Sequence, residues 1–269
     1  MHPFDILKIT PKTNCGRCGH PTCLAFAAAV AKTGADARSC PFIDHEKLPA
    51  VAPIADALDN LPRQHDLALI EHLKGKIAGL DFATIAPSLG AAWSPNEPDT
   101  LSFAYLGRPI KVSKQGIHMA GGEPTDPRDQ ILLYNYVHST GGRAPTGNWV
   151  GMESLPNSIS KIKTLNRYCE ERLAQCLDGQ PRNKVENIAR HLAATMEAET
   201  AANLTLTVPV LPMIPERIIF WAADREEGFS AKVKVLFDHQ VMDFLDLESL
   251  VFSAERMAER IAELAEDRC

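Results

Sequence analysis

Four of the seven cysteines in this chain fall within one short N-terminal segment, and their spacing constrains the fold more than any other feature. They follow the pattern C-x2-C-x4-C-x16-C and are Cys15, Cys18, Cys23 and Cys40. Four thiolates can ligate a [4Fe–4S] cluster or a structural zinc ion. Zinc sites commonly pair two C-x2-C knuckles, whereas this segment contains only one. The spacing therefore favours a [4Fe–4S] cluster over zinc, and either of these over four unliganded thiols.

The residues between these cysteines suit a cluster-binding loop. Gly16 and Gly19 are predicted to adopt positive φ and to let backbone N–H groups approach the sulfur atoms. His20, in the same loop, is either a hydrogen-bond donor to the cluster or an exposed loop residue. Residues 24–32 predict a helix, after which a turn would bring the fourth cysteine back to the other three.

The segment that carries the four cysteines also resembles a known module. Residues 10–41, TPKTNCGRCGHPTCLAFAAAVAKTGADARSCP, closely resemble the N-terminal [4Fe–4S] module of corrinoid iron–sulfur protein large subunits. A similar module occurs in the cluster-bearing subunit of Rnf-type electron-transport complexes. The resemblance implies that the four cysteines ligate one cubane cluster and that the module transfers electrons at low potential. In the corrinoid family this transfer reductively reactivates the cobalt centre.

The remainder of the chain resembles an uncharacterised domain family that in anaerobes is often joined to this module. The matching stretches are LLYNYVHSTGG, GNWVGMESLP and FWAADREEGFSAKVKVLFDHQVMDFLDLESL. A Rossmann-type corrinoid domain carries the signature D-x-H-x-x-G. The nearest pair here, Asp238-His239, has the wrong spacing and no following glycine.

A corrinoid such as cobalamin would therefore need a different pocket in this part of the chain. Gly147, Trp149, Trp221 and Asp224 are candidates for it, because they lie in or next to the matching stretches and combine aromatic with polar groups. The alternative is that both tryptophans simply fill the core.

Charge and proline content divide the chain. Residues 1–40 carry a net charge of +3, and since the whole chain carries −6, the remainder carries −9. Four prolines lie between positions 41 and 65, which predicts a connector with short helical turns. We therefore expect a cluster module over residues 1–45, a connector over 46–65 and a larger domain over 66–269.

The larger part predicts an α+β domain with an early hairpin, central helices and late antiparallel strands. Asp126 is the expected N-cap of one central helix, and Cys169 and Cys176 are interpreted as core thiols of another. The predicted helices are 66–80, 126–138, 158–178, 182–202 and 248–266, and the predicted strands are 100–106, 109–113, 204–211, 217–223 and 231–237.

Several function classes are disfavoured. A net charge of −6 and a pI near 5.9 argue against a nucleic-acid binder. The longest apolar run has nine residues, too short for a membrane span, and the N-terminus lacks the pattern of a secretory signal, so a cytoplasmic location is expected. No P-loop, catalytic triad or paired-carboxylate signature is present.

These observations predict an electron-transfer or cofactor-carrying protein rather than a stand-alone enzyme. The favoured function is electron transfer through one [4Fe–4S] cluster to a redox partner protein, such as a corrinoid protein, in an anaerobic system. Two alternatives stay open. In one, the larger domain holds a corrinoid that the cluster reduces. In the other, the cluster serves only as a structural element or a redox sensor.

Overall fold

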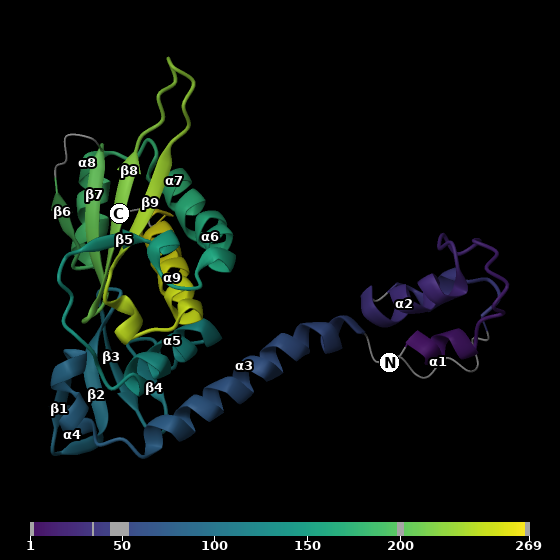
Figure 1. Cartoon of the computed structure of the whole chain (residues 1–269), viewed down its shortest axis with the longest axis horizontal. Coiled ribbons are helices and arrows are strands. Elements are labelled where there is room, and N and C mark those ends of the chain that lie inside the picture. The colour runs from purple at the N-terminus through teal and green to yellow at the C-terminus, as the bar shows by residue number, and fades with distance from the viewer. Residues whose placement is uncertain (1–2, 34, 44–53, 198–201, 267–269) are drawn as a thin grey trace. The chain divides into compact units, whose positions relative to one another are not determined.

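A computed structural model describes residues 3–33, 35–43, 54–197 and 202–266, which divide into two units, Met1–His65 and Asp66–Cys269. The first unit contains helices α1 (Pro3–Lys8) and α2 (Cys23–Thr33), which pack against each other, and a 3-10 turn at Ala37–Ser39 (Figure 1). The alanine-rich sequence of α2 favours a helix. These elements enclose a small apolar core of Ile6, Phe26, Ala27, Val30, Cys40 and Ile43.

The predicted connector differs from the structure in its second half. Residues 44–53 lie outside the described part of the chain, but 54–65 belong to one continuous helix, α3 (Ile54–Ala78), rather than to short turns. Pro62 lies inside this helix, where it removes one backbone donor without ending the helix. The helix predicted over 66–80 is confirmed, with Ile70, Leu73 and Ile77 buried.

In the second unit, the end of α3 is followed by helix α4 (Phe82–Ile85), a 3-10 turn (Pro87–Leu89) and a four-stranded antiparallel sheet in the order β1-β2-β3-β4. The strands are β1 (Ala92–Ser94), β2 (Glu97–Tyr105), β3 (Arg108–Ser113) and β4 (Ile117–Met119). Tyr105 pairs with Arg108, which leaves Leu106 and Gly107 as a two-residue turn with positive φ at both positions. This confirms the predicted hairpin.

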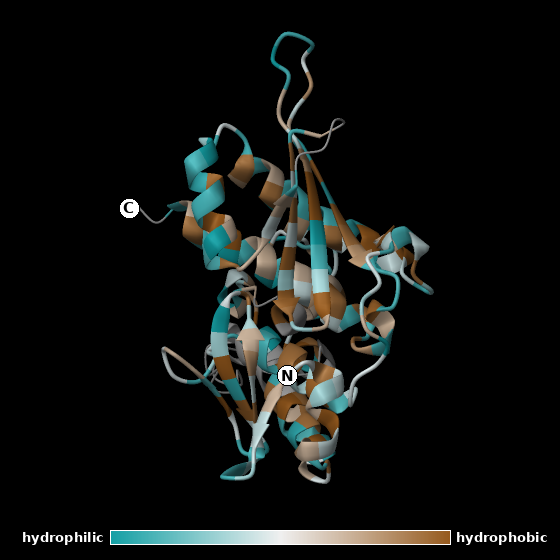
Figure 2. Cartoon of the chain, turned by 90° about the vertical axis from the view of Figure 1, so that its left-hand side faces the viewer, coloured by the Kyte–Doolittle hydropathy of each residue, from teal (hydrophilic) through white to brown (hydrophobic). Residues whose placement is uncertain are grey.

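A second antiparallel sheet has the order β5-β9-β8-β7-β6. Its strands are β5 (Trp149–Gly151), β6 (Thr195–Glu197), β7 (Leu204–Leu211), β8 (Ile214–Trp221) and β9 (Lys232–Asp238). Buried and partly exposed positions alternate along β8, and Figure 2 shows hydrophobic and hydrophilic residues alternating along strands of this sheet. One face of the sheet must therefore be covered.

Helices provide that cover (Figure 1). They are α5 (Pro127–His138), α6 (Ile159–Leu165), a π-helical turn (Asn166–Glu170), α7 (Glu171–Leu177), α8 (Arg182–His191) and α9 (Leu247–Glu266), with further 3-10 turns at Met152–Ser154 and Val241–Asp243. The long helix α9 contacts α5, α6, α7 and α8, while α7 contacts β8 and β9. None of the helices in the described residues is long and apolar enough to cross a membrane.

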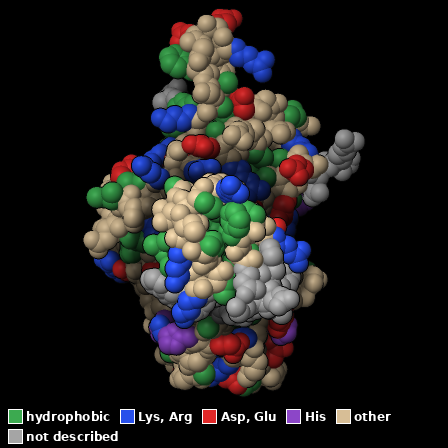
Figure 3. All heavy atoms as spheres, turned by 90° about the vertical axis from the view of Figure 1, so that its right-hand side faces the viewer, with side chains coloured by type: hydrophobic (Ala, Val, Ile, Leu, Met, Phe, Trp, Pro, Cys, Tyr) green, Lys and Arg blue, Asp and Glu red, His purple; other side chains and the backbone are tan. Residues whose placement is uncertain are grey.

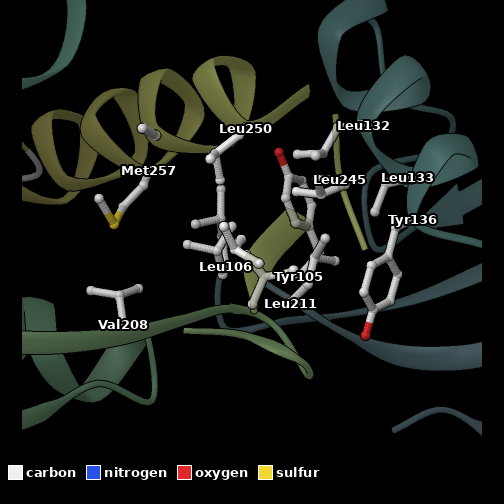
Figure 4. Packing of buried hydrophobic residues seen from close by; sticks show 14 of the residues in the cluster. Tyr105, Leu106, Leu132, Leu133, Tyr136, Val208, Leu211, Leu245, Leu250 and Met257 are labelled. Atoms are coloured by element: carbon white, nitrogen blue, oxygen red, sulfur yellow. The ribbon is translucent and has the colours of Figure 1, made fainter. Parts of the chain in front are cut away.

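The two sheets share one hydrophobic core. The backbone N–H of Leu106, in the β2–β3 turn, donates to the carbonyl oxygen of Val210 in β7 at 3.0 Å. Figure 4 shows side chains from both sheets, from α5 and α9 and from the connecting segments at Leu106 and Leu245 around this junction; the labelled ones are Tyr105, Leu106, Leu132, Leu133, Tyr136, Val208, Leu211, Leu245, Leu250 and Met257. The two sheets therefore belong to one domain.

The predicted α+β class is confirmed, but one helix was predicted too long. The helix expected over 182–202 ends at His191, and Thr195–Glu197 instead form β6, paired with β7. Ala193 adopts a positive φ at this change of direction. Pairing with a neighbouring strand outweighs local helix propensity here.

One buried carboxyl group in this core is unusual. Glu216 occupies an inward-facing position of β8 and is fully buried. The hydroxyl of Ser253 in α9 donates to its Oε1, while Oε2 has no hydrogen-bond partner among the residues that the structure describes. Burial raises the pKa of Glu216 to about 8, so the folded protein holds this group protonated at neutral pH.

Substituting Glu216→Gln is therefore expected to change how stability depends on pH. Between the ordinary pKa of 4.5 and the folded value of about 8, the folded state binds a proton that the unfolded state releases. The wild type thus loses stability as pH rises through this window, whereas glutamine cannot titrate. The variant should gain a few kcal/mol relative to the wild type between pH 5 and pH 8, measured by urea unfolding. Parallel pH profiles for the two proteins would contradict this assignment.

Candidate metal centre

The cysteine loop adopts an unusual backbone conformation. Lys12, Asn14, Gly16 and Gly19 all have positive φ, and the N–H of Gly19 donates to the carbonyl oxygen of Gly16 at 3.0 Å. Cys18 is one of the residues within this turn. Positive φ at Gly16 and Gly19 agrees with the sequence-based expectation, because glycine adopts it without steric cost.

Side-chain hydrogen bonds join this loop to helix α2. The Oδ1 of Asn14 accepts from the backbone N–H of Cys23 at 2.8 Å, and the Oγ1 of Thr22 accepts from the N–H of Ala25 at 3.0 Å. These two acceptors satisfy N–H groups that the first helical turn leaves free. Cys23 is thereby held at the start of α2.

The fourth cysteine returns to the loop through α2 and the 3-10 turn. Asp36 caps that turn by accepting from the N–H of Arg38 at 2.9 Å, and Cys40 follows directly. Cys40 is buried in the small core of the first unit, and Cys18 packs against the same core. The structure therefore places the distant fourth cysteine beside the loop, although 16 residues separate it from Cys23.

The four thiols differ in exposure. Cys15 is exposed, Cys18 is half-buried, and Cys23 and Cys40 are buried. The backbone N–H of Arg17 donates to the Cys15 thiol and, together with the Thr13 side chain, lowers the pKa of Cys15 below its ordinary value. A lowered pKa favours the thiolate, which is the form that binds metal.

The donor set fits an iron–sulfur cluster by its chemistry. Among the described residues, no three His, Cys, Asp or Glu side chains are placed to hold one metal ion together. In a cubane each iron takes its own cysteine thiolate, so four ligand sulfurs surround the cluster and need not converge on one point. Cys15, Cys18, Cys23 and Cys40 would be the ligands.

Two aromatic contacts lie beside the cysteines. The ring of His20 lies 5.7 Å from that of Phe26, centroid to centroid, so His20 is half-buried against α2 rather than freely exposed. The guanidinium carbon of Arg17 lies 5.4 Å from the centroid of the Phe42 ring. The sequence does not predict this cation–π contact, because 24 residues separate its partners.

The structure does not gather the candidate pocket residues of the larger unit. Trp149 pairs with Asp238 and Trp221 pairs with Lys232, at opposite ends of β9 and about 20 Å apart along the strand. Asp224 lies beyond Trp221 in the β8–β9 connection, where its carboxylate accepts from the N–H groups of Glu226 and Glu227 at 3.0 Å. Both tryptophans are half-buried.

Gly147 belongs instead to a loop that Asp238 organises. The buried carboxylate of Asp238 accepts from the N–H groups of Thr146, Gly147 and Gln240 at 2.8, 2.7 and 3.0 Å. Burial opposes its ionisation, yet these backbone donors bring the pKa of Asp238 below its ordinary value. Asp238, from the pair nearest to the corrinoid signature, therefore stabilises a loop through these hydrogen bonds.

The two cysteines of the central helices lie in the core, as predicted. Cys169 is fully buried in the π-helical turn, and Cys176 is half-buried and packs against the core. Burial raises the pKa of both thiols. A raised pKa favours the thiol over the thiolate, which is the form that binds metal.

Comparison with known proteins assigns both parts of the chain. A family model described as "Domain of unknown function (DUF3786)" matches residues 81–260, well over half of the chain. The chain belongs to the DUF3786 family. The DUF3786 match lies entirely within the second unit, and it confirms the expected resemblance to an uncharacterised family.

The cysteine segment ahead of the DUF3786 domain has its own relatives. A family model described as "Putative Fe-S cluster" matches residues 11–42. The corrinoid/iron-sulfur protein large subunit of Moorella thermoacetica is 50% identical over 57 residues, covering 19% of this chain and 13% of that protein. The acetyl-CoA decarbonylase/synthase complex subunit gamma of Methanocaldococcus jannaschii is 44% identical over 44 residues, covering 16% and 9%.

This chain thus spans only about a tenth of the length of the curated relatives it matches. No solved structure matches it significantly. The resemblance to corrinoid iron–sulfur proteins is confirmed for the cysteine segment.

Proposed function

We propose that Cys15, Cys18, Cys23 and Cys40 hold one [4Fe–4S] cluster and that the protein transfers single electrons through it. The observation that carries this proposal is the match of an iron–sulfur family model to residues 11–42, because that segment contains all four cysteines. A bound cubane supplies a one-electron redox couple whose potential depends on hydrogen bonds to sulfur and on solvent exposure.

The chain's own residues would set that environment. Cys23 lies at the N-terminus of an 11-residue helix, where the helix dipole favours negative charge. The turn from Gly16 to Gly19 places further backbone groups on both sides of Cys18 along the chain. Cys40 and Cys23 are buried, which excludes water from one side, whereas Cys15 is exposed. Electrons would therefore enter and leave on the Cys15 side.

We further propose that the electrons serve a corrinoid-linked or other anaerobic redox system. The support is the name of the Moorella relative, which is a corrinoid/iron–sulfur protein. Trp149 and Trp221 lie at opposite ends of β9, which removes the argument for a planar cofactor between them. The acceptor in this proposal is accordingly a separate protein. We place the chain in the cytoplasm, because Cys169 and Cys176, the described cysteines outside the proposed ligand set, are free thiols, as a reducing compartment favours.

A redox titration of the anaerobically reconstituted full chain tests the proposal. We expect one reversible one-electron transition, followed by EPR of the reduced protein, in the low-potential part of the range open to such clusters. Brown protein that stays redox-silent down to the potential of dithionite would instead support a purely structural cluster. Stoichiometric retention of added hydroxocobalamin on gel filtration would overturn the assignment of the acceptor to a separate protein.

A further inference from the structure

Two large apolar side chains are exposed directly beside the proposed ligands. Leu24 follows Cys23, and Phe42 lies two residues after Cys40. Each is 49% exposed. Since consecutive Cα atoms are 3.8 Å apart, both side chains begin within about 8 Å of a ligand backbone. A protein that docks on this side of the ligands would contact both side chains.

A basic side chain accompanies one of them. Arg17, between Cys15 and Cys18, is exposed, and its guanidinium group lies over the Phe42 ring. Arginine stacked on an aromatic ring keeps its charge while its orientation is restricted. Arg17 and Phe42 therefore present a positive charge and an apolar surface together, close to the exposed Cys15.

The other charged side chains that the structure describes in this unit are mainly basic. Among its described side chains Asp36 is the only acid, and its carboxylate caps the 3-10 turn. On the face of the whole chain that Figure 3 draws, Lys and Arg side chains lie among hydrophobic and acidic ones. The described basic residues, all exposed, are Lys8, Lys12, Arg17 and Arg38.

We propose that Lys12, Arg17, Leu24 and Phe42 form a docking surface for an acidic electron-transfer protein. The inference rests on the proposed function and adds the kind of partner and the residues that meet it. Opposite charges steer diffusional encounter and raise association rates, while an apolar centre excludes water at the contact. Electron-transfer encounters are commonly small and transient, which a surface of four residues in this short unit would suit.

Stopped-flow reduction of the cluster-loaded full chain tests this proposal. The electron donor is a reduced acidic ferredoxin, which loses one electron as the protein gains one. We expect the rate to fall as salt rises from about 20 to about 500 mM. At low salt the double substitution Lys12→Glu and Arg17→Glu should slow it about tenfold or more. Leu24→Ala with Phe42→Ala should slow it at every salt concentration.

A matched control carries the same change of charge in the other unit. Arg182→Glu with Arg225→Glu alters two exposed arginines of the DUF3786 domain and should leave the ferredoxin rate within about twofold of wild type. Carbodiimide cross-linking gives a second readout, since it should join the Lys12 amine to a ferredoxin carboxylate. Equal slowing by the two charge reversals, or a rate independent of salt, would overturn the docking surface.

Two further outcomes separate this proposal from its rivals. A small zwitterionic viologen of zero net charge should reduce the wild type and all variants at the same rate. If it fails to reduce the wild type, the proposed electron-transfer function fails, and not merely the docking surface.

Because the remainder of the chain is itself acidic, a second copy of this chain is the competing partner for the docking surface. Dimers that Lys12→Glu with Arg17→Glu abolishes, seen by sedimentation, would replace the ferredoxin-like partner with that copy.

Discussion

Replacing Cys40 with alanine is expected to abolish the intact cluster, with a several-fold loss of iron and sulfide from the purified protein. Three thiolates would remain, and a cubane needs a ligand on each of its four irons. Cys40 is only 3% exposed and belongs to the small core of the first unit, so water cannot readily take its place. Iron and acid-labile sulfide, assayed on anaerobically reconstituted protein, provide the measurement.

Cys169→Ala is the matched control for this substitution. It removes the same thiol from an equally buried position, but in the DUF3786 domain, where burial keeps the pKa of Cys169 raised. Iron and sulfide should stay at the wild-type level. A Cys40→Ala protein with full iron beside an iron-poor Cys169→Ala protein would reverse the assignment of the ligands.

Substituting Gly107→Ala should prevent the second unit from folding or destabilise it by more than about 3 kcal/mol. Gly107 occupies the β2–β3 turn with a φ of 74°. A Cβ atom there would lie 1.9 Å from the carbonyl oxygen of His191 and 2.9 Å from the Cα of Leu192. Both are backbone atoms at the end of α8, so relief of the clash requires the hairpin and α8 to separate. Urea unfolding measures the loss.

Gly228→Ala is the control that separates the steric clash at Gly107 from the cost of placing alanine at positive φ. Gly228 has a φ of 78°, but an added Cβ atom would meet nothing within 4 Å. This variant should lose only the cost of placing alanine in the left-handed region, about 1 kcal/mol. If both substitutions cost the same, the close contact between the hairpin and α8 is wrong.

Local signals predicted the longer elements of the DUF3786 domain well. Asp126 caps α5 by accepting from the N–H of Arg128 at 2.9 Å, with Pro127 in the first turn, as the sequence indicates. The hairpin around Gly107 and the strands β7, β8 and β9 also follow from alternation and turn residues. In each case the determining interactions lie within a few residues along the chain.

Elements that depend on distant partners escaped prediction. The strands β1, β4, β5 and β6 have three residues each, too few to show a period of two, and they form only because a longer neighbour supplies hydrogen bonds. The sequence of residues 195–197 predicts a helix, but pairing with β7 makes them a strand. The π-helical turn at Asn166–Glu170 likewise has no signal in the residue pattern.

The same distinction holds for the candidate sites. The cysteine loop could be predicted because its glycines and three of its thiols lie within a few residues of one another. The pocket proposed around Trp149 and Trp221 relied on nearness to the matching stretches, and β9 holds these residues at its two ends. Arg17 and Phe42, by contrast, meet across the fold without any signal in the sequence.

We expect this chain to carry a single [4Fe–4S] cluster on its N-terminal cysteines. Metal and sulfide analysis of the full chain, purified anaerobically and combined with Mössbauer spectroscopy, tests this expectation. We expect about four iron and four sulfide per chain, with the spectrum of a cubane and without stoichiometric zinc or cobalt. One zinc per chain with no iron would contradict it, because the same four thiolates would then form a structural zinc site.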